Sequence, residues 1–258
     1  MPDWTTGLGA ALITDPWFYA VAIPAVLLMG ISKSGFGAGF GSLAVPIMAL
    51  AIPVPQAAAI MLPLLLVMDL LALVSYARHF DRDLVRLLVP AGLVGTVVGT
   101  VLFGVLSAKT VAAVVGGLTL LFLAQRLFFP PRPDAPPPPR WAGWLLGVAS
   151  GFTSFVSHAG GPPVSVYVLP LKLPPVSFSA TMAVFFAVVN ASKWPPYAWL
   201  GLIDLRNMAT ALALMPVAPI GVWLGVHVVR RVRQEWFYRF IYAGMFLTAV
   251  KLLWDGLR

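Results

Sequence analysis

The chain alternates long apolar runs with short polar breaks along nearly its whole length. A helix needs roughly 17 to 25 mostly apolar residues to cross the hydrocarbon core of a bilayer, and most of these runs reach or approach that length. We interpret ten runs as membrane segments, and the pattern therefore predicts an all-α integral membrane protein with about ten transmembrane helices. The runs are 17–31, 38–52, 56–76, 84–106, 109–128, 141–157, 162–173, 178–200, 205–229 and 235–257.

Composition supports the same class of protein. Hydrophobic residues make up 60% of the 258 positions and charged residues only 10%, with a mean hydropathy of +0.90, whereas soluble domains carry about 25% charged residues. The formal net charge is +8, but the basic residues flank apolar runs, so we attribute them to topology and lipid contact rather than to nucleic acid. The chain contains no cysteine, which excludes disulfides, thiolate metal sites and thiol nucleophiles.

The distribution of lysine and arginine predicts an orientation, because short basic loops stay in the cytoplasm. With the acidic amino terminus outside, four basic residues fall outside, namely Lys109, Arg206, Lys251 and Arg258. The others in loops fall inside: Arg78, Arg82, Arg86, Arg126, Arg132, Arg140, Lys172, Arg230, Arg231 and Arg233. We expect a multi-pass protein of the cell membrane, the inner membrane in a bacterium, with both termini outside the cytoplasm and no removable signal peptide.

The stretch PPRPDAPPPPR, residues 130–140, divides the chain into two parts. Its prolines prevent a helix, so we interpret it as a cytoplasmic linker between a first repeat, 1–129, and a second repeat, 141–258, of five segments each. An offset of 121 residues aligns the parts and matches, among others, Gly30 with Gly151, Gly39 with Gly160, Tyr76 with Tyr197 and Asp83 with Asp204. An odd number of crossings per repeat inverts the second repeat, and inverted repeats in transporters place the substrate site between them near the bilayer midplane.

Glycine-rich polar turns interrupt the apolar pattern at matching places in the two parts. They are GISKSGFGAGFGSLAVP, residues 30–46, and GFTSFVSHAGGPPVSVYVLP, residues 151–170. The apolar runs beside them are short, so we expect both turns to dip toward the midplane, where irregular backbone must be buried or line a wet cavity. A helix starting at Ala38 or at Pro162 would direct its positive end at that cavity and favour an anion. The alternative is that the glycines only let helices pack closely.

Five ionisable or strongly polar side chains lie inside apolar runs: Lys33, Asp69, His158, Asn190 and Lys193. Such residues are costly in a bilayer and are functional candidates by default. Lys193 or Lys33 is a candidate cation for the substrate, but either lysine is equally able to neutralise Asp69 in a structural ion pair, and Lys33 is also able to reach the cytoplasmic surface. Asp69 and His158 are candidates for proton coupling, although a histidine in a turn is often only satisfied by backbone.

The two motifs together resemble the TauE/SafE family of sulfite exporters, in which the second motif typically runs into Gly-Gly-Pro-Pro, as HAGGPP does here. The resemblance covers residues 17–255 and implies export of sulfite or an organosulfonate such as sulfoacetate by alternating access. Phe40, between Gly39 and Gly41, departs from the usual glycine cluster. We therefore expect a substrate site that draws on both motifs and on the buried polar residues. Its candidate residues are Lys33, Ser34, Gly37, Gly39, Ser157, His158, Gly160, Asn190 and Lys193.

Three other functions compete with an exporter. An anion channel or a membrane accessory protein without transport activity is the stronger alternative. An intramembrane hydrolase is weaker, since the chain contains no nucleophile-elbow spacing and no HExxH pattern. We expect no enzymatic activity, no cofactor and no bound metal, and the expected partners are a small anion and membrane lipid. Oligomeric state and the driving force stay open.

Overall fold

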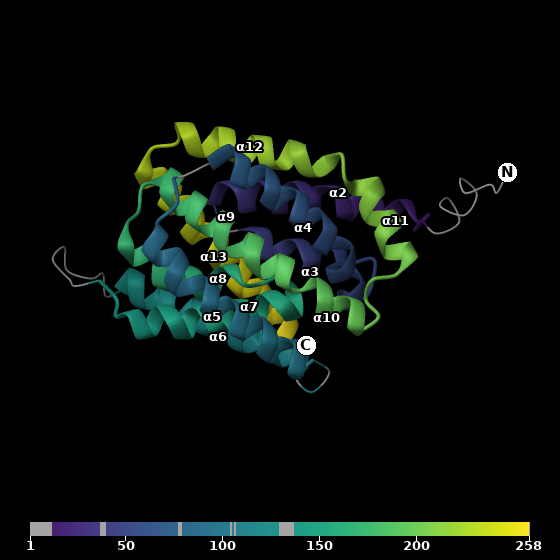
Figure 1. Cartoon of the computed structure of the whole chain (residues 1–258), viewed down its shortest axis with the longest axis horizontal. Coiled ribbons are helices and arrows are strands. Elements are labelled where there is room, and N and C mark those ends of the chain that lie inside the picture. The colour runs from purple at the N-terminus through teal and green to yellow at the C-terminus, as the bar shows by residue number, and fades with distance from the viewer. Residues whose placement is uncertain are drawn as a thin grey trace.

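A computed structural model describes residues 12–36, 40–76, 79–103, 105, 107–128 and 137–257, and all of the regular secondary structure in these residues is helical (Figure 1). Most of residues 130–140, the expected linker, lie outside this described part, as do Gly37 and Gly39. The first half contains α2 (Pro16–Ile31), η1 (Ser32–Phe36), η2 (Phe40–Leu43), α3 (Ala44–Met48), α4 (Val54–Tyr76), α5 (Arg82–Val101) and α6 (Ala108–Phe128). The second half contains α7 (Arg140–Ser157), α8 (Gly161–Val168), η3 (Leu169–Leu171), α9 (Pro175–Ser192), α10 (Trp194–Trp199), α11 (Leu205–Leu214), α12 (Val217–Arg231) and α13 (Gln234–Leu257).

Five helical stretches of the described residues are long and apolar enough to cross a membrane. They are Pro16–Phe36, Val54–Tyr76, Arg82–Val101, Pro175–Trp199 and Gln234–Leu257. A sixth crossing results if α11 and α12, which meet at an angle of 50°, are counted as one span. The chain is thus an all-helical, multi-pass membrane protein.

Prolines break two of the expected apolar runs. The run 178–200 divides at Lys193 into α9 and α10, because Pro195 and Pro196 follow at once and lack the backbone N–H groups that would continue the hydrogen-bond ladder. The run 205–229 bends between α11 and α12 at Pro216. Both breaks lie in the second half of the chain.

The two glycine-rich turns have different backbones. In the first half, α2 passes into a π-helical turn, and after the undescribed residues a 3₁₀ turn leads into α3. The helix start expected at Ala38 lies outside the described residues. Within the expected run 38–52, the chain forms a 3₁₀ turn from Phe40 to Leu43, and the α-helix covers only Ala44–Met48. In the second half, α7 ends at His158, whose φ of 53° lies in the left-handed region, and α8 begins at Gly161, one residue before the expected start. The second turn thus follows the prediction closely.

Helices cross very closely at several glycines. A Cβ built on Gly151 of α7 would lie 2.0 Å from the carbonyl oxygen of Gly92 in α5, and one built on Gly30 of α2 would lie 2.9 Å from Cα of Gly221 in α12. Real Cβ atoms do not approach other atoms so closely, so glycine is required at these crossings. Close packing of small residues, which we expected as the alternative role of these glycines, is therefore part of the fold.

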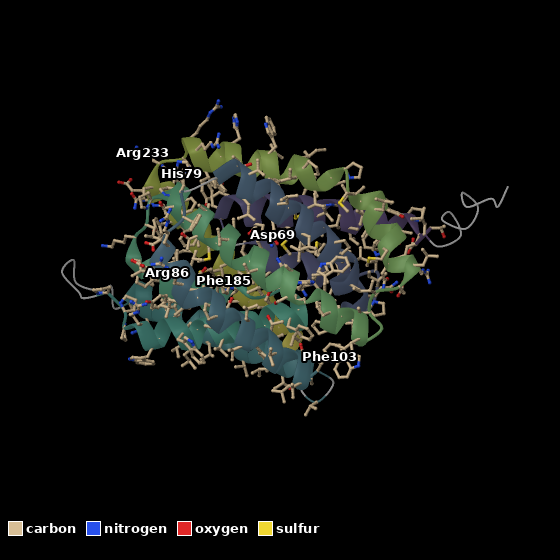
Figure 2. The ribbon with its side chains drawn as sticks, in the orientation of Figure 1. Asp69, His79, Arg86, Phe103, Phe185 and Arg233 are labelled. Carbon is tan, nitrogen blue, oxygen red and sulfur yellow. The ribbon has the colours of Figure 1, made fainter. Side chains whose placement is uncertain are left out.

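Basic residues gather at one end of the molecule, where three loops meet. Arg230 donates to the carbonyl of Ser75 at 2.6 Å, and Gln234 donates to the carbonyl of Lys172 at 3.2 Å. Figure 2 shows Arg86 and Arg233 at this end, Phe103 toward the opposite end and Asp69 between the two. Three of the segments predicted to share the cytoplasmic side, those next to Tyr76, Lys172 and Arg230, therefore lie together.

Two tyrosines hold the two turns in the same way. Tyr76 of α4 donates its hydroxyl hydrogen to the carbonyl of Ser34, and Tyr197 of α10 donates to the carbonyl of Phe155 at 2.8 Å. Each pair is separated by 42 residues along the chain, and the second pair follows the first by the offset of 121 residues that aligns the two parts of the sequence.

Candidate functional site

Buried charges and polar groups meet at the centre of the helix bundle. The described residues contain three charged side chains that are buried, Lys33 at 6% exposure, Asp69 at 2% and Lys193 at 0%. Lys33 projects from the π-helical turn after α2, Asp69 lies on α4, and Lys193 ends α9. Single π-helical turns are rare in proteins overall, but those that occur are often at functional sites. Here the turn directs a lysine into the core.

A continuous chain of contacts joins these groups. Lys33 Nζ forms an ion pair with Asp69 Oδ1, and Asp69 Oδ2 accepts a hydrogen bond from Asn190 Nδ2 at 2.8 Å. Asn190 Oδ1 accepts from Lys193 Nζ, also at 2.8 Å. Lys193 therefore does not neutralise Asp69 directly, since the amide of Asn190 stands between the two charges.

The second lysine is surrounded by neutral acceptors. In addition to Asn190, Lys193 Nζ contacts Ser154 Oγ at 2.7 Å and His158 Nδ1 at 3.0 Å. Three acceptors match the three hydrogens of an ammonium group. Lys193 is thus held by hydrogen bonds, and no carboxylate among the described residues pairs with it.

The contacts of His158 define which ring nitrogen carries the proton. Nε2 lies 3.0 Å from the carbonyl oxygen of Ala58, and because a carbonyl can only accept, Nε2 must donate. Nδ1 then carries no proton, and its lone pair accepts a hydrogen bond from Lys193. The ring is neutral in this arrangement. His158 also caps α7 in the left-handed backbone conformation, which is uncommon for a residue with a Cβ, and its backbone N–H donates to the carbonyl of Ser154 at 3.1 Å.

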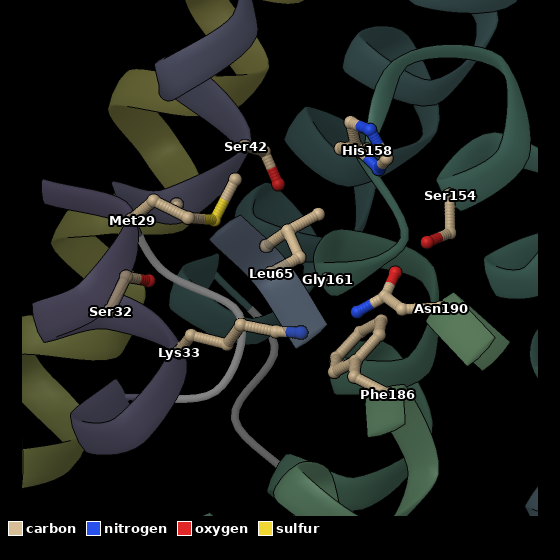
Figure 3. Close-up of a pocket in the computed structure, with 11 residues that line it drawn as sticks. Met29, Ser32, Lys33, Ser42, Leu65, Ser154, His158, Gly161, Phe186 and Asn190 are labelled. Atoms are coloured by element: carbon tan, nitrogen blue, oxygen red, sulfur yellow. The ribbon is translucent and has the colours of Figure 1, made fainter. Parts of the chain in front are cut away.

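A small cavity adjoins this cluster (Figure 3). Its polar lining comes from both motifs and from α9: Ser32, Lys33, Ser42, Ser154, His158 and Asn190. Met29, Leu65 and Phe186 supply most of the apolar lining. The cavity offers about 30 Å³ to the centres of water molecules, and since one water needs about 10 to 15 Å³ on this measure, its size suits a few waters or one small anion.

Lys33 extends across this cavity toward Asn190 and Phe186 (Figure 3). Its Nζ lies 5.6 Å from the centroid of the Phe186 ring, and apart from Asp69 no hydrogen-bond acceptor within the described residues satisfies it. An ammonium group has three hydrogens. Lys33 therefore retains donor capacity on the side that faces the cavity.

The arrangement brings together a buried cation, hydroxyl and amide donors, and a cavity of anion size. Comparison with known protein families matches residues 22–252 to the family described as "Sulfite exporter TauE/SafE". The chain belongs to the TauE/SafE family. No curated protein and no solved structure matches the chain. Membership implies a membrane exporter of sulfite- or sulfonate-type anions, and members of this family are transporters rather than enzymes.

Not all candidate residues of this TauE/SafE chain reach the cavity. Lys33, His158 and Asn190 line it, whereas Lys193 is not among its lining residues and contacts it through Asn190, His158 and Ser154. Lys33 is also buried, so the alternative in which it reaches the cytoplasmic surface is wrong.

Three further candidate residues, Ser34, Ser157 and Gly160, do not line this cavity and make packing or backbone contacts elsewhere. The Ser34 hydroxyl donates to the carbonyl of Gly30 at 2.6 Å and lies against α12. Ser157 lines a different cavity, and its hydroxyl is 3.4 Å from the carbonyl of Thr153. A Cβ on Gly160 would lie 2.7 Å from the carbonyl oxygen of Ser150, so this glycine permits close packing at the start of α8.

Several residues that line the cavity were not among the candidates predicted from the sequence, chiefly Ser32, Ser42, Ser154 and Phe186. One signal was present for Ser154, because the offset of 121 residues aligns it with Lys33. Phe186 carried no such signal, since a phenylalanine in an apolar helix looks the same whether it packs against lipid, core or a cavity.

Proposed function

We propose that this protein exports a small sulfur-containing anion, sulfite or an organosulfonate such as sulfoacetate, from the cytoplasm by alternating access. The observation that carries the proposal is Lys33, a buried cation that faces an anion-sized cavity with unused hydrogen-bond donors. A buried ammonium group is expensive in a membrane. An anionic substrate would repay that cost while it is bound.

The substrate in this proposal lies between the two motifs. Lys33 and Ser32 contact it from the first half, and Ser154, His158 and Asn190 from the second. Lys193 positions this second group through its three hydrogen bonds. Gly37 and Gly39 stay predictions for the same site, and the small volume of the cavity favours a compact anion.

Alternating access in this proposal rests on ten membrane segments in two inverted repeats, 1–129 and 141–258. The matched hydrogen bonds of Tyr76 and Tyr197 support a shared scaffold. Asp69 and Asn190, which are separated by 121 residues and therefore equivalent under the alignment offset, contact each other. Equivalent residues of two repeats meet where the repeats are related by a two-fold axis, so this contact supports a site on that axis.

The basic end of the molecule is assigned to the cytoplasm in this proposal. An interior-negative potential then favours anion exit by roughly 2.3 kcal/mol per charge per 100 mV. Because the chain has no cysteine, single cysteines report sidedness cleanly. Arg233→Cys should react with an impermeant thiol reagent only from the cytoplasmic side, and Arg206→Cys only from outside. Reaction of both from the same side would contradict this topology.

Counterflow of sulfite in proteoliposomes tests the transport itself. A carrier exchanges labelled external sulfite against unlabelled internal sulfite with saturation, whereas a channel does not, and an accessory protein gives no flux. Lys33→Met should abolish counterflow. Arg86→Gln is the matched control, because it removes a charge that is 74% exposed at the basic end. Equal loss in both variants, or full flux in Lys33→Met, would count against the site.

Coupling to protons through Asp69 or His158 stays a prediction. Asp69 forms an ion pair with Lys33 and accepts a hydrogen bond from Asn190. His158 contacts both Lys193 and the carbonyl of Ala58. A pH-sensitive dye enclosed in the same vesicles measures proton movement with sulfite. Proton flux that vanishes in Asp69→Asn while sulfite flux persists would identify Asp69 as the coupling group.

A further inference from the structure

We infer that the site selects singly charged over doubly charged anions, an inference that rests on the proposed function. Its basis is the number of buried charges. Three residues of charged types are buried among the described residues, Lys33, Asp69 and Lys193. We assign an ammonium to Lys193 because three acceptors surround its Nζ, and an ammonium and a carboxylate to Lys33 and Asp69 because the two form an ion pair. The cluster therefore has a net charge of +1.

His158 does not alter this sum. Its Nε2 donates to a carbonyl and its Nδ1 accepts from Lys193, so the ring is neutral. Ser154 and Asn190 are neutral as well and connect Lys193 to the cavity wall. The positive charge without a carboxylate partner is thus that of Lys193, which does not line the cavity but contacts residues that do.

Binding of a monoanion brings the buried cluster to zero net charge. A dianion would leave one uncompensated negative charge in the same low-dielectric volume, which is costly. At the effective dielectric constant of a protein interior, one uncompensated unit charge a few ångströms from a bound anion changes the affinity for that anion by more than about tenfold. Hydrogen sulfite and organosulfonates whose sulfonate is their only charged group fit this site better than the sulfite dianion or sulfate. Of the substrates named in the proposed function, this disfavours sulfoacetate, whose carboxylate adds a second negative charge.

Asp69 is the residue that limits the charge of the substrate. It already neutralises one of the two lysines through its contact with Lys33. Replacing it with asparagine keeps the shape and the hydrogen bond to Asn190 feasible but raises the net charge of the cluster to +2. Asp69→Asn should therefore accept a dianion.

Methanesulfonate and sulfate are matched probes, because both are tetrahedral and they differ by a methyl group in place of a charged oxygen. Binding is measured by calorimetry on the purified protein, at one pH at which both probes keep their charge. We expect the wild-type protein to bind methanesulfonate at least about tenfold more tightly than sulfate. In Asp69→Asn this ratio should fall by at least about tenfold.

The double variant Asp69→Asn, Lys193→Met restores a net charge of +1 and should regain the preference for methanesulfonate. Lys193→Met alone lowers the charge to zero and should weaken binding of both probes. An unchanged ratio in Asp69→Asn would overturn the inference, and so would an unchanged affinity in Lys193→Met, because Lys193 would then contribute no charge.

The wild-type ratio decides the matter even if a variant does not fold. Equal or tighter binding of sulfate by a wild-type protein that still binds sulfite overturns the selectivity and leaves the proposed function standing. Absence of binding for sulfite and both probes overturns the proposed function and the inference together.

Discussion

The two glycine-rich turns share a scaffold but carry different charges. Tyr76 and Tyr197 bind the turns through equivalent backbone carbonyls. At the equivalent positions facing the centre, however, the first half has Lys33 where the second has Ser154, and Asp69 where the second has Asn190. The difference shows that two turns with the same tyrosine contact can carry different side-chain chemistry. The first half supplies an ion pair, and the second supplies a set of neutral groups around Lys193.

Lys33→Met, in the turn of the first half, should have the largest effect on stability and anion binding. It removes the cation from the cavity and leaves Asp69 buried with only the amide of Asn190. Breaking a buried pair by deleting one partner costs about 3 to 5 kcal/mol, so thermal unfolding in detergent should occur at a clearly lower temperature. The double variant Lys33→Met, Asp69→Asn should recover most of that stability but no anion binding. Recovery of binding in the double variant would show that Lys33 serves the fold alone.

The helix crossings beside the two turns offer a second test. Gly30 and Gly151 are equivalent under the offset of 121 residues, but an added Cβ meets backbone at 2.9 Å in the first and at 2.0 Å in the second. Gly151→Ala should cost about 3 kcal/mol, the upper end of ordinary overpacking, and more than Gly30→Ala. Gly117→Ala is the control, since an added Cβ there meets nothing within 4 Å. The order of the three melting temperatures checks the prediction, and an equal loss at Gly30 and Gly151 would contradict it.

Ser154→Ala tests the second half of the comparison at the position equivalent to Lys33. It removes one of the three acceptors around Lys193 and leaves a buried ammonium hydrogen unsatisfied, which costs about 1 to 3 kcal/mol. We expect a smaller loss of stability than for Lys33→Met, together with weakened rather than abolished sulfite counterflow. Ser157→Ala is the matched control, because its hydroxyl lies outside this cavity. Equal effects at Ser154 and Ser157 would argue against the assignment.

The smallest effects concern the shared scaffold. Tyr76→Phe and Tyr197→Phe each delete one buried hydrogen bond to a backbone carbonyl, worth about 0.5 to 1.5 kcal/mol. Because the two contacts are equivalent, the two variants should lose similar stability and retain anion binding. Unequal losses, measured as melting temperatures side by side, would show that the resemblance of the two turns is only geometric.

Much of the fold was predictable from the apolar pattern. The pattern located the helices within a few residues because a bilayer accepts only segments whose backbone is satisfied internally. It was less accurate in the run 38–52, where we expected one helix and the chain has a 3₁₀ turn over Phe40–Leu43 and an α-helix only over Ala44–Met48. Glycines allow several backbones at similar cost, so composition alone did not select among them.

The buried ionisable and polar residues of the candidate site stood out in the sequence, but the rest of the cavity lining and the pairings did not. Lys33, Asp69, His158, Asn190 and Lys193 stood out because charged and polar side chains are costly in an apolar helix. Which lysine contacts Asp69 was undecided, since hydrophobic periodicity carries no information about partners on other helices.

By itself, the sequence determined the solvent, the class of fold and the small set of polar and charged residues that interrupt apolar runs, because each of these follows from local composition and spacing. Only the tertiary structure decided that Lys33 pairs with Asp69, that Asn190 separates Asp69 from Lys193, and that Ser154 completes the second group. These pairings join residues up to 121 positions apart. They depend on how closely α2, α4, α7 and α9 approach one another, and that distance is set by packing of the whole bundle.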